Sequence, residues 1–198
     1  MCGLVACSGV EFASQYLVDS LKRLEYRGYD SAGIALQSSN GLFYKKEKGP
    51  IHNLESTLIA ENDNDLVSNS NSGIAHTRWA THGVPSTENA HPHLSSDGKI
   101  AIVHNGIIEN YQKLKNELIA KGYNFQSETD SEVIVYLLED AYEGNLKKAL
   151  LSVVKRLRGA FGIAVICSDE PEVLLGIRRG SPLILGIGQN QNYWLASD

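Results

Sequence analysis

The sequence is poor in the features that define several large classes of protein. It contains only 3 Cys, 1 Met and 5 Pro among its 198 residues. Such a low cysteine content does not suit a disulfide scaffold of this length, so the sequence favours a reducing, cytoplasmic location. No apolar run approaches the ~20 residues of a membrane-spanning helix, and the first residues lack the basic start and long apolar stretch of a signal peptide. No membrane partner is therefore expected.

Runs of basic residues are also missing. The chain has 18 Lys+Arg against 23 Asp+Glu, which gives a net charge of -5. Proteins that bind nucleic acid through its phosphates usually show a basic patch, so no nucleic-acid partner is expected. Hydrophobic residues make up 42% of the chain and charged residues 21%, which is typical of an ordinary folded core. Residues 1–198 are therefore expected to form one globular domain.

Short strand-like runs occur between amphipathic helical segments. Apolar or β-branched runs bounded by turn residues predict strands over residues 2–8, 32–37, 42–46, 73–79, 99–103, 162–167, 173–177, 182–187 and 193–196. Apolar residues at helical spacing predict helices over residues 17–24, 107–118, 133–141 and 146–157. Because the last strands follow one another without helices, the pattern predicts an α+β layered fold with mostly antiparallel sheets.

Local patterns refine this prediction at three places. The predicted helix at 107–118 puts His104-Asn105-Gly106-Ile107 where a strand gives way to a helix. Thr129-Asp130-Ser131-Glu132 has the pattern of a capping box, which would open the helix at 133–141. Residues 62–72 are polar and are expected to form an exposed loop.

Cys2 is a candidate nucleophile because of its position. If Met1 is removed, Cys2 bears a thiol and a free α-amine, with reference pKa values of about 8.5 and about 7.7–8.0. A base whose pKa lies near the operating pH is suited to accept and return a proton. One residue would then supply both nucleophile and general base, as in N-terminal nucleophile enzymes. The alternative is that Cys2 is a small apolar residue at the start of a strand.

Histidines gather in one part of the chain. Five of the 6 His lie between residues 76 and 104, at His76, His82, His91, His93 and His104. Glycine and proline punctuate this stretch, and loops of that kind commonly bear function. A metal site around residues 91–93 is an alternative, but HExxH, a Cys-x₂-Cys pair and an acidic ligand at a familiar interval are missing. We expect no metal and no other cofactor, and a structural role for at least two of the histidines.

Polar residues elsewhere suggest how a substrate would be held. Asn105 and Gly106 could direct a side-chain N–H and a backbone N–H at one oxyanion, although an Asn cap followed by a turn glycine is also common. Arg78 offers a planar fork for a carboxylate, and Asp130 can hold an ammonium group. Such a pair could bind the two charges of a free amino acid. For Asp130 the alternative is a favourable charge at a helix N-terminus.

Several segments occur together in an order that identifies a family. They are Met1-Cys2-Gly3, Tyr26-Arg27-Gly28-Tyr29-Asp30-Ser31-Ala32-Gly33, His76-Thr77-Arg78-Trp79-Ala80-Thr81-His82-Gly83, Asn89-Ala90-His91-Pro92-His93, residues 104–110 and residues 127–130. Across essentially the whole chain, the sequence resembles the N-terminal glutaminase domain of glutamine–fructose-6-phosphate amidotransferases. The run at 77–83 favours this family over the amidophosphoribosyltransferases, which share the Cys-Gly start. The resemblance implies a four-layer αββα sandwich of the N-terminal nucleophile hydrolase type.

The resemblance also implies a role for each site residue. Cys2 would attack the side-chain amide of L-glutamine, release ammonia and leave a γ-glutamyl thioester that water hydrolyses to L-glutamate. Asn105 and Gly106 would stabilise the oxyanion. Arg78 would bind the α-carboxylate of glutamine and Asp130 its α-ammonium group. Further residues implied around the substrate are Trp79, Thr81 and His82 in a loop that closes over it, Arg27 beside the nucleophile, and His91 and His104 in support.

The resemblance implies that this chain has only part of a larger enzyme. The complete family members have paired sugar-isomerase domains, which bind fructose 6-phosphate, use the ammonia to make glucosamine 6-phosphate and form a homodimer. Residues 1–198 lack those domains, and the apolar run at 194–196 near the end suggests a first domain of a longer protein. The alternative from a different class is a catalytically silent amino-acid-binding or regulatory module, which would keep Arg78 and Asp130 without the thiol chemistry.

Overall fold

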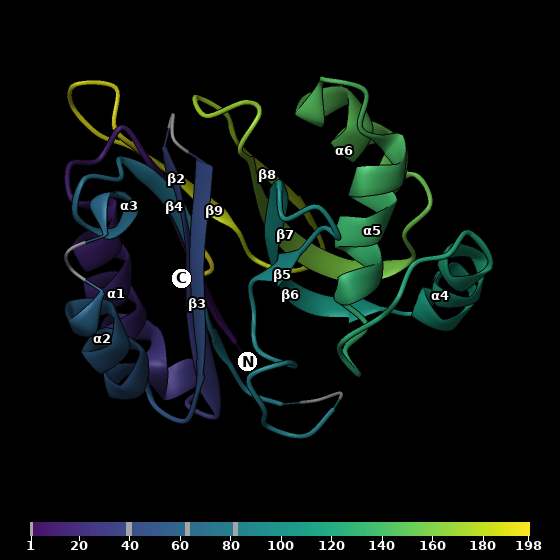
Figure 1. Cartoon of the computed structure of the whole chain (residues 1–198), viewed down its shortest axis with the longest axis horizontal. Coiled ribbons are helices and arrows are strands. Elements are labelled where there is room, and N and C mark those ends of the chain that lie inside the picture. Colours follow the sequence, from purple (N-terminus) through teal and green to yellow (C-terminus); the bar gives the residue numbers. More distant parts are fainter. Residues whose placement is uncertain (1, 39–40, 62–63, 81–82) are drawn as a thin grey trace.

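The computed structural model describes residues 2–38, 41–61, 64–80 and 83–198. Two β-sheets lie face to face, and helices cover the outer face of each sheet (Figure 1). The larger sheet has the strand order β3-β2-β4-β1-β10-β9, and the smaller sheet has the order β5-β6-β7-β8. The paired strands of both sheets run antiparallel. The expected four-layer αββα sandwich with mostly antiparallel sheets is confirmed.

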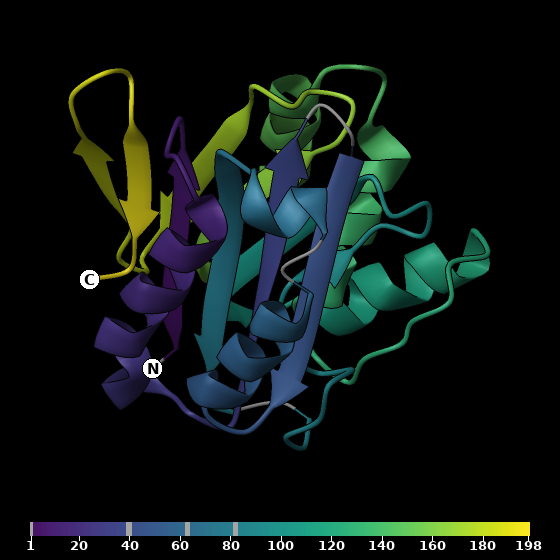
Figure 2. The same cartoon turned by 60° about the vertical axis from the view of Figure 1, so that its left-hand side comes forward.

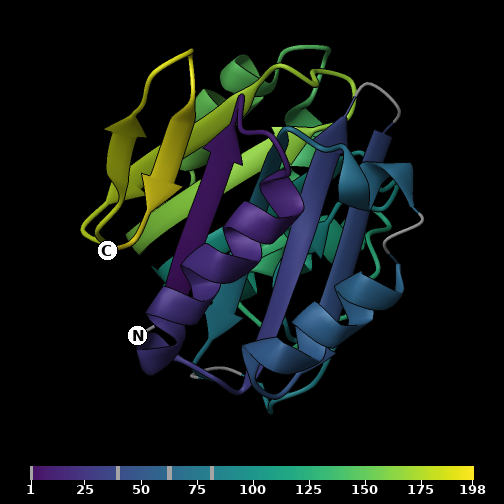
Figure 3. The ribbon, with the colours of Figure 1, turned by 90° about the vertical axis from the view of Figure 1, so that its left-hand side faces the viewer.

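The larger sheet belongs to the half of the molecule that also contains α1 and α2. Its strands are β1 (Gly3–Ser8), β2 (Ser31–Ser38), β3 (Gly41–Lys48), β4 (Ser72–Arg78), β9 (Ile184–Ile187) and β10 (Tyr193–Ala196). The helical elements of this half are α1 (Ala13–Leu24), the 3-10 helix η1 (Glu25–Arg27), α2 (Ile51–Ala60) and α3 (Asp65–Ser68). Helix α1 packs on β1 and β4, and α2 packs on β2 and β3 (Figure 3). The β9–β10 hairpin forms one edge of the sheet (Figure 2).

The smaller sheet has its helices on the opposite side of the molecule. Its strands are β5 (His93–Leu94), β6 (Ile100–Ile108), β7 (Gly159–Cys167) and β8 (Leu174–Arg179). Its helices are α4 (Tyr111–Ala120), α5 (Glu132–Ala141) and α6 (Leu146–Val154). Helix α5 lies at the centre of this outer layer, between α4 and α6.

Three hydrophobic cores separate the four layers, because successive side chains of a strand point to opposite faces. In β1, Leu4 packs between the sheets and Val5 packs beneath the helices of the larger sheet. In β6, Val103 packs between the sheets and Ile102 packs beneath α4, α5 and α6. This alternation decides which side chains from the two sheets meet in the middle of the sandwich.

The helices expected from apolar spacing are present as α1, α4, α5 and α6. In α1, for example, the predicted stripe residues Leu17 and Leu21 are fully buried. Helix α2 escaped prediction. Its residues Ile51, Leu54 and Leu58 are buried at helical spacing, and Pro50 stands directly before its first residue. Both signals were readable in the sequence.

The prediction of an exposed loop over residues 62–72 is wrong for its described part. Asp65–Ser68 form one turn of helix, and β4 begins at Ser72. The side chain of Val67 is buried against the core beneath α1 and α2. Val67 therefore anchors a segment whose composition is mostly polar. Residues 62 and 63 lie outside the described residues.

The prediction of a helix starting at Ile107 is also wrong. Strand β6 pairs with β7 as far as Ile108, which lies opposite Gly159, and α4 begins only at Tyr111. The apolar residue at position 107 matched the helical spacing by coincidence, and pairing with β7 overrides that spacing.

The predicted capping box at residues 129–132 does not form. Helix α5 begins at Glu132, and the Ser131 side chain makes no capping hydrogen bond. The Glu132 carboxylate instead accepts hydrogen bonds from the backbone N–H groups of Gln126 (2.9 Å) and Ser127 (2.8 Å). The carboxylate thus ties the preceding loop to the helix start, which leaves Asp130 available for other contacts.

Candidate active site

Cys2 stands at the end of the central strand of the larger sheet. Strand β1 lies between β4 and β10, and Gly3 is opposite Thr77, so Cys2 lies beside the end of β4. The Cys2 Sγ accepts a hydrogen bond from the Trp79 backbone N–H (3.3 Å) and lies 3.6 Å from the Trp79 carbonyl oxygen. Met1 lies outside the described residues.

The surroundings of Cys2 keep its thiol protonated. Burial raises the pKa of the Cys2 thiol, and the hydrogen bond from Trp79 and the charge of Arg78 offset only part of that increase. A buried thiol of this kind needs a base to become a nucleophile, because the thiolate is the reactive form.

Asn105 approaches Cys2 from the opposite sheet. Its side-chain Nδ2 donates a hydrogen bond to the Cys2 carbonyl oxygen (3.1 Å), and its Oδ1 lies 2.9 Å from Nε2 of His76. Both Asn105 and Gly106 lie inside β6, so the expectation that they mark a helix start is wrong. Donors to an oxyanion would therefore come from a strand held on the sheet, not from a helix N-terminus.

Gly106 occupies a position that only glycine fits. Its φ angle is 133°, in the region that disfavours residues with a Cβ. A Cβ at this position would also collide with the carbonyl oxygen of Ala160 on β7. The strand can therefore approach β7 closely just beyond Asn105.

Arg78 and Asp130 are both almost fully buried near Cys2. The Arg78 guanidinium donates to the carbonyl oxygens of Gly83 (3.1 Å) and Val84 (3.4 Å). The Asp130 Oδ2 accepts a hydrogen bond from the backbone N–H of Ile108 (2.6 Å). Asp130 is thus held by β6, which argues against the alternative that it only caps a helix.

A small cavity joins most of the predicted site residues. Its volume is about 30 Å³, close to one water molecule's share of liquid, and its lining residues come from both sheets. The lining residues are Cys2, Arg78, Trp79, His91, His104, Gly106, Thr129, Asp130 and Ser131. A thiol, a guanidinium and a carboxylate therefore line the same small cavity.

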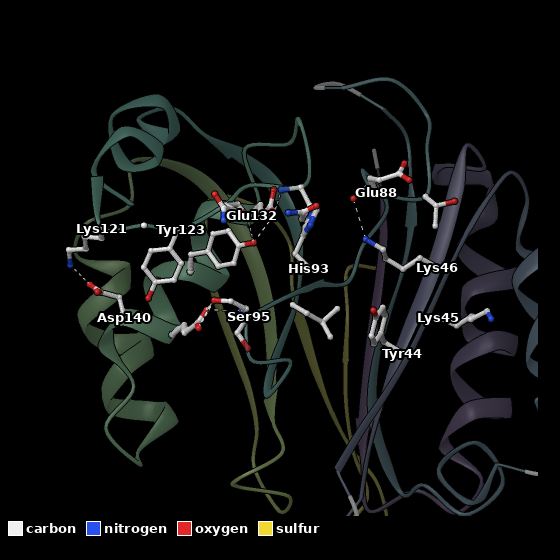
Figure 4. A pocket seen from close by; sticks show the side chains of 18 residues that line it. Tyr44, Lys45, Lys46, Glu88, His93, Ser95, Lys121, Tyr123, Glu132 and Asp140 are labelled. Atoms are coloured by element: carbon white, nitrogen blue, oxygen red, sulfur yellow. Dashed lines mark hydrogen bonds and ion pairs between the residues drawn. The ribbon is translucent and has the colours of Figure 1, made fainter. Parts of the chain in front are cut away.

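A much larger cavity lies elsewhere, at the edges of the two sheets. It has a volume of about 1030 Å³, and Tyr44 and Lys46 face His93 and Tyr123 across it (Figure 4). None of the predicted site residues lines it. Its carboxylates already have partners: Asp140 pairs with Lys121 at 2.5 Å, and Glu139 accepts from Ser96. Size alone is thus a poor guide to the chemistry of this chain.

Four of the clustered histidines meet in the interior as neutral imidazoles. Burial lowers the pKa of His76 to about 3 and that of His104 to about 4. Burial also lowers the pKa values of His91 and His93 well below their usual value. Within the part of the chain that the structure describes, no group of three His, Cys, Asp or Glu side chains is arranged to hold a metal ion.

The individual histidines make different contacts. Nδ1 of His104 lies 2.8 Å from Oγ of Ser131, and Nε2 of His93 lies 3.0 Å from Oγ1 of Thr129. The ring of His91 lies 4.2 Å from that of His76. His91 and His104 also line the small cavity, where the resemblance placed them.

Of the other predicted residues, Arg27 contacts Ser197 and Asp198, and Trp79 is half exposed. The Arg27 guanidinium donates to the Ser197 carbonyl oxygen (3.2 Å) and forms an ion pair with Asp198 (2.9 Å). The Trp79 ring is 49% exposed and meets Tyr29 edge to face, with ring centroids 5.8 Å apart. Thr81 and His82 lie outside the described residues.

His76 belongs to the predicted histidine cluster, but no role in the site was predicted for it. Its imidazole contacts Asn105, the predicted oxyanion donor. A signal was available: His76 follows Ile74 by two positions in a strand, so both side chains point to the same face. The sequence alone did not show that Asn105 faces His76 from the other sheet.

Comparison with known proteins gives the family. A family model described as a glutamine amidotransferase domain matches residues 76–198. The chain belongs to the glutamine amidotransferase domain family. This domain is 50% identical over 198 residues to glutamine--fructose-6-phosphate aminotransferase [isomerizing] of Clostridium perfringens and equally to that of Aquifex aeolicus, in each case covering 100% of the chain and 32% of the relative. It therefore spans about a third of the length of these curated relatives.

Solved structures agree with the fold. The glutamine phosphoribosylpyrophosphate amidotransferase of B. subtilis, complexed with ADP and GMP, matches the domain with a TM-score of 0.82 and 27% identity, over 99% of this chain and 42% of that chain. A glutamine aminotransferase class-II domain protein from Silicibacter pomeroyi matches with a TM-score of 0.65 and 16% identity, over 98% and 88% of the two chains. No helix among the described residues is both long and apolar enough to span a bilayer.

Proposed function

We propose that this chain hydrolyses L-glutamine to L-glutamate and ammonia. The observation that supports this best is the convergence of Cys2, Arg78, Asp130 and Gly106 on one small cavity, with Asn105 bonded to the backbone of Cys2. The family match supports glutamine as the substrate class. A thiol, an amide donor and two opposite charges are the groups that this hydrolysis requires.

The reaction follows from the protonated state of the thiol. Once Met1 has been removed, the Cys2 α-amine takes the proton from Sγ, and the thiolate attacks the δ-carbon of glutamine. Asn105 and Gly106 stabilise the oxyanion of the tetrahedral intermediate. The intermediate collapses by breaking the C–N bond, and the protonated amine gives its proton to the departing nitrogen, which leaves as ammonia. Water then hydrolyses the thioester to L-glutamate and restores the Cys2 thiol.

The opposite end of glutamine determines specificity. Arg78 pairs with the α-carboxylate and Asp130 with the α-ammonium group, so a ligand that lacks either charge loses a charge-assisted hydrogen bond. The Arg78 guanidinium has five N–H donors, and two of its bonds reach the carbonyl oxygens of Gly83 and Val84. These bonds tie Arg78 to the chain that follows it, where Trp79, Thr81 and His82 would enclose the substrate.

The wider role follows from the relatives. In a protein of their length, residues 1–198 would form the glutaminase domain, and paired sugar-isomerase domains would use the ammonia to convert fructose 6-phosphate to glucosamine 6-phosphate. A homodimer would form through those domains. The free thiols of Cys2, Cys7 and Cys167 are compatible with a cytoplasmic location.

The test combines an intact mass with an assay of ammonia and glutamate. Protein whose mass shows that Met1 is absent should release ammonia from L-glutamine, and the Cys2→Ala variant should release none while unfolding at the same temperature as the parent. Undiminished release by Cys2→Ala would refute the proposal. A glutamine-like electrophile should add one adduct to Cys2. Binding of glutamine without turnover or adduct would instead favour the silent amino-acid-binding module.

A further inference from the structure

His76 and Asn105 face each other across the inner core of the sandwich. His76 lies on β4 and Asn105 on β6, the strands that bring the two sheets together next to Cys2. Within β4 the side chain of Ile74 packs between the sheets, and that of Ala75 packs beneath the helices. Alternation therefore turns His76 towards the opposite sheet, where its Nε2 lies 2.9 Å from Oδ1 of Asn105.

The backbone of Cys2 decides which way the Asn105 amide points. The carbonyl oxygen of Cys2 can only accept a hydrogen bond, so the Asn105 group facing it at 3.1 Å must be the NH₂. The amide oxygen then faces His76, and His76 must offer an N–H there. Its pKa is lowered to about 3 by burial, so the ring is neutral and its proton resides on Nε2.

The position of His76 itself is tightly constrained. Its side chain is fully buried, and the ring of His91 lies against it at a tilt of 44°. A terminal amide torsion has a broad energy minimum, so a second partner narrows the range of angles that the Asn105 amide can adopt. The Cys2 carbonyl provides one partner and His76 provides the other.

We propose that His76 is a positioning residue that keeps the Asn105 amide N–H directed at the oxyanion formed on attack by Cys2. The inference rests on the proposed hydrolysis of glutamine and adds a residue to its machinery. Asn105 donates one N–H to the Cys2 carbonyl, and the second N–H of the same group remains for the oxyanion. When the hydrogen bond from His76 is lost, the Asn105 amide is held on one side only, by the Cys2 carbonyl, and its second N–H is no longer fixed towards the oxyanion.

The first test compares variants at position 76. His76→Leu removes the donor, and His76→Gln restores an amide N–H close to the place of Nε2. We expect His76→Leu to lower kcat for glutamine by about 10- to 100-fold. Removing an oxyanion donor itself typically lowers kcat by about 100- to 1000-fold, so the effect of the positioning residue should not exceed it. KM should change little, because Arg78 and Asp130 hold the other end of the substrate. His76→Gln should recover most of kcat.

The matched control is His93→Leu. His93 is an equally buried histidine of the same cluster, but its Nε2 contacts Thr129 and not Asn105. Its substitution imposes a similar loss of a buried imidazole, so the unfolding temperatures of the two leucine variants can be compared directly. A fall in kcat in His93→Leu as large as in His76→Leu would overturn the inference, since the effect would then come from general disturbance of the core.

A second measurement separates the oxyanion from the nucleophile. Alkylation of Cys2 by iodoacetamide occurs at a saturated carbon and forms no oxyanion, so it reports only on the thiol. We expect His76→Leu to be alkylated at the parent's rate while its glutamine turnover falls. Equal losses in both reactions would contradict the inference, because the damage would lie in Cys2 itself.

A third measurement does not depend on turnover. Nitrogen-15 NMR of the parent protein should find the neutral His76 ring protonated on Nε2, and an Nδ1-protonated ring would overturn the inference whatever the activity. If the parent failed to hydrolyse glutamine, the proposed function would be refuted. The NMR measurement of the His76 tautomer would still test, independently of activity, whether His76 holds the Asn105 amide.

Discussion

The backbone N–H of Trp79 donates a hydrogen bond to the Cys2 Sγ over 3.3 Å. This bond favours a negative charge on the sulfur, whereas burial of the thiol opposes it more strongly. The Cys2 thiol thus lies against the end of the strand that also bears Arg78, and its surroundings do not favour the thiolate. The consequences for pH, substrate binding and stability can each be measured.

The first prediction concerns the pH dependence of Cys2 alkylation. A raised pKa means less thiolate at neutral pH, so the rate with iodoacetamide should be half-maximal above pH ~8.5, the value of an unperturbed thiol. Alkylation rates measured by mass spectrometry from about pH 6 to about pH 10, on both sides of that reference value, test this prediction. Cys7, whose pKa burial raises to about 12, is the internal control and should stay unmodified. A midpoint below that of a free thiol would contradict the desolvated environment of Cys2.

The second prediction concerns Asp130→Asn. The amide oxygen can still accept the Ile108 N–H, so the fold should persist, but the negative charge for the substrate ammonium is lost. Loss of a hydrogen bond to a charged group costs about 1.5–3 kcal/mol, so KM for glutamine should rise about 10- to 100-fold with a smaller change in kcat. Steady-state kinetics give both constants. Asp140→Asn, which breaks an ion pair with Lys121 far from Cys2, should leave KM unchanged.

The third prediction concerns the buried histidines and stability. The unfolded chain binds protons at histidine near pH 6.5, whereas folded His104 binds one only near pH 4. Between about pH 4 and about pH 6.5 the unfolded state therefore binds more protons than the folded state. The free energy of unfolding has its full value above this range and falls as the pH is lowered through it. Each such histidine contributes a slope of up to about 1.4 kcal/mol per pH unit. Urea unfolding at a series of pH values measures the total.

His104→Asn should make that slope shallower. An asparagine amide can take the place of Nδ1 and keep the hydrogen bond with Ser131 without titrating. The difference in free energy of unfolding between the parent and His104→Asn should therefore become smaller towards low pH. A variant with the parent's slope would mean that His104 is already protonated in the folded protein.

The fourth prediction compares two glycines with positive φ. Gly106→Ala should lower the free energy of unfolding by about 2–4 kcal/mol, because the added Cβ meets the Ala160 carbonyl and the φ angle is unfavourable. Gly98→Ala should cost only about 1 kcal/mol, since its Cβ would enter open space. Chemical denaturation of both variants provides the comparison. Equal losses would mean that φ alone, and not the close approach of β7, requires glycine at 106.

The layered fold was largely predictable from the sequence because it follows from local patterns. Short apolar or β-branched runs predict β1 and β4, and apolar residues at helical spacing predict α1 and α5. The errors arose where a distant partner overrode such a pattern. Ile107 fits a helical stripe, yet pairing with Ala160 keeps it in β6. The Glu132 carboxylate fits a capping box, yet it bonds to the loop at 126–127.

The site was predictable in composition but not in arrangement. Cys2, Arg78 and Asp130 could be chosen from their chemistry and from the family resemblance, and the structure gathers all three at one cavity. Two contacts join residues from different parts of the fold. The Ile108 N–H donates to Asp130, and His76 contacts Asn105. Contacts of that kind depend on how the two sheets are placed against each other, which no local pattern encodes.

The pairing of β1 with β10 has a consequence for synthesis of the protein. Leu4 exchanges hydrogen bonds with Ser197, the N–H of Leu4 donating to the Ser197 hydroxyl and the Ser197 N–H donating to the Leu4 carbonyl. Within these 198 residues, β1 is made long before β10, the strand that pairs with it on one side. That side of β1 must therefore stay without this partner until β10 has been made, and contacts between residues so distant in sequence form slowly.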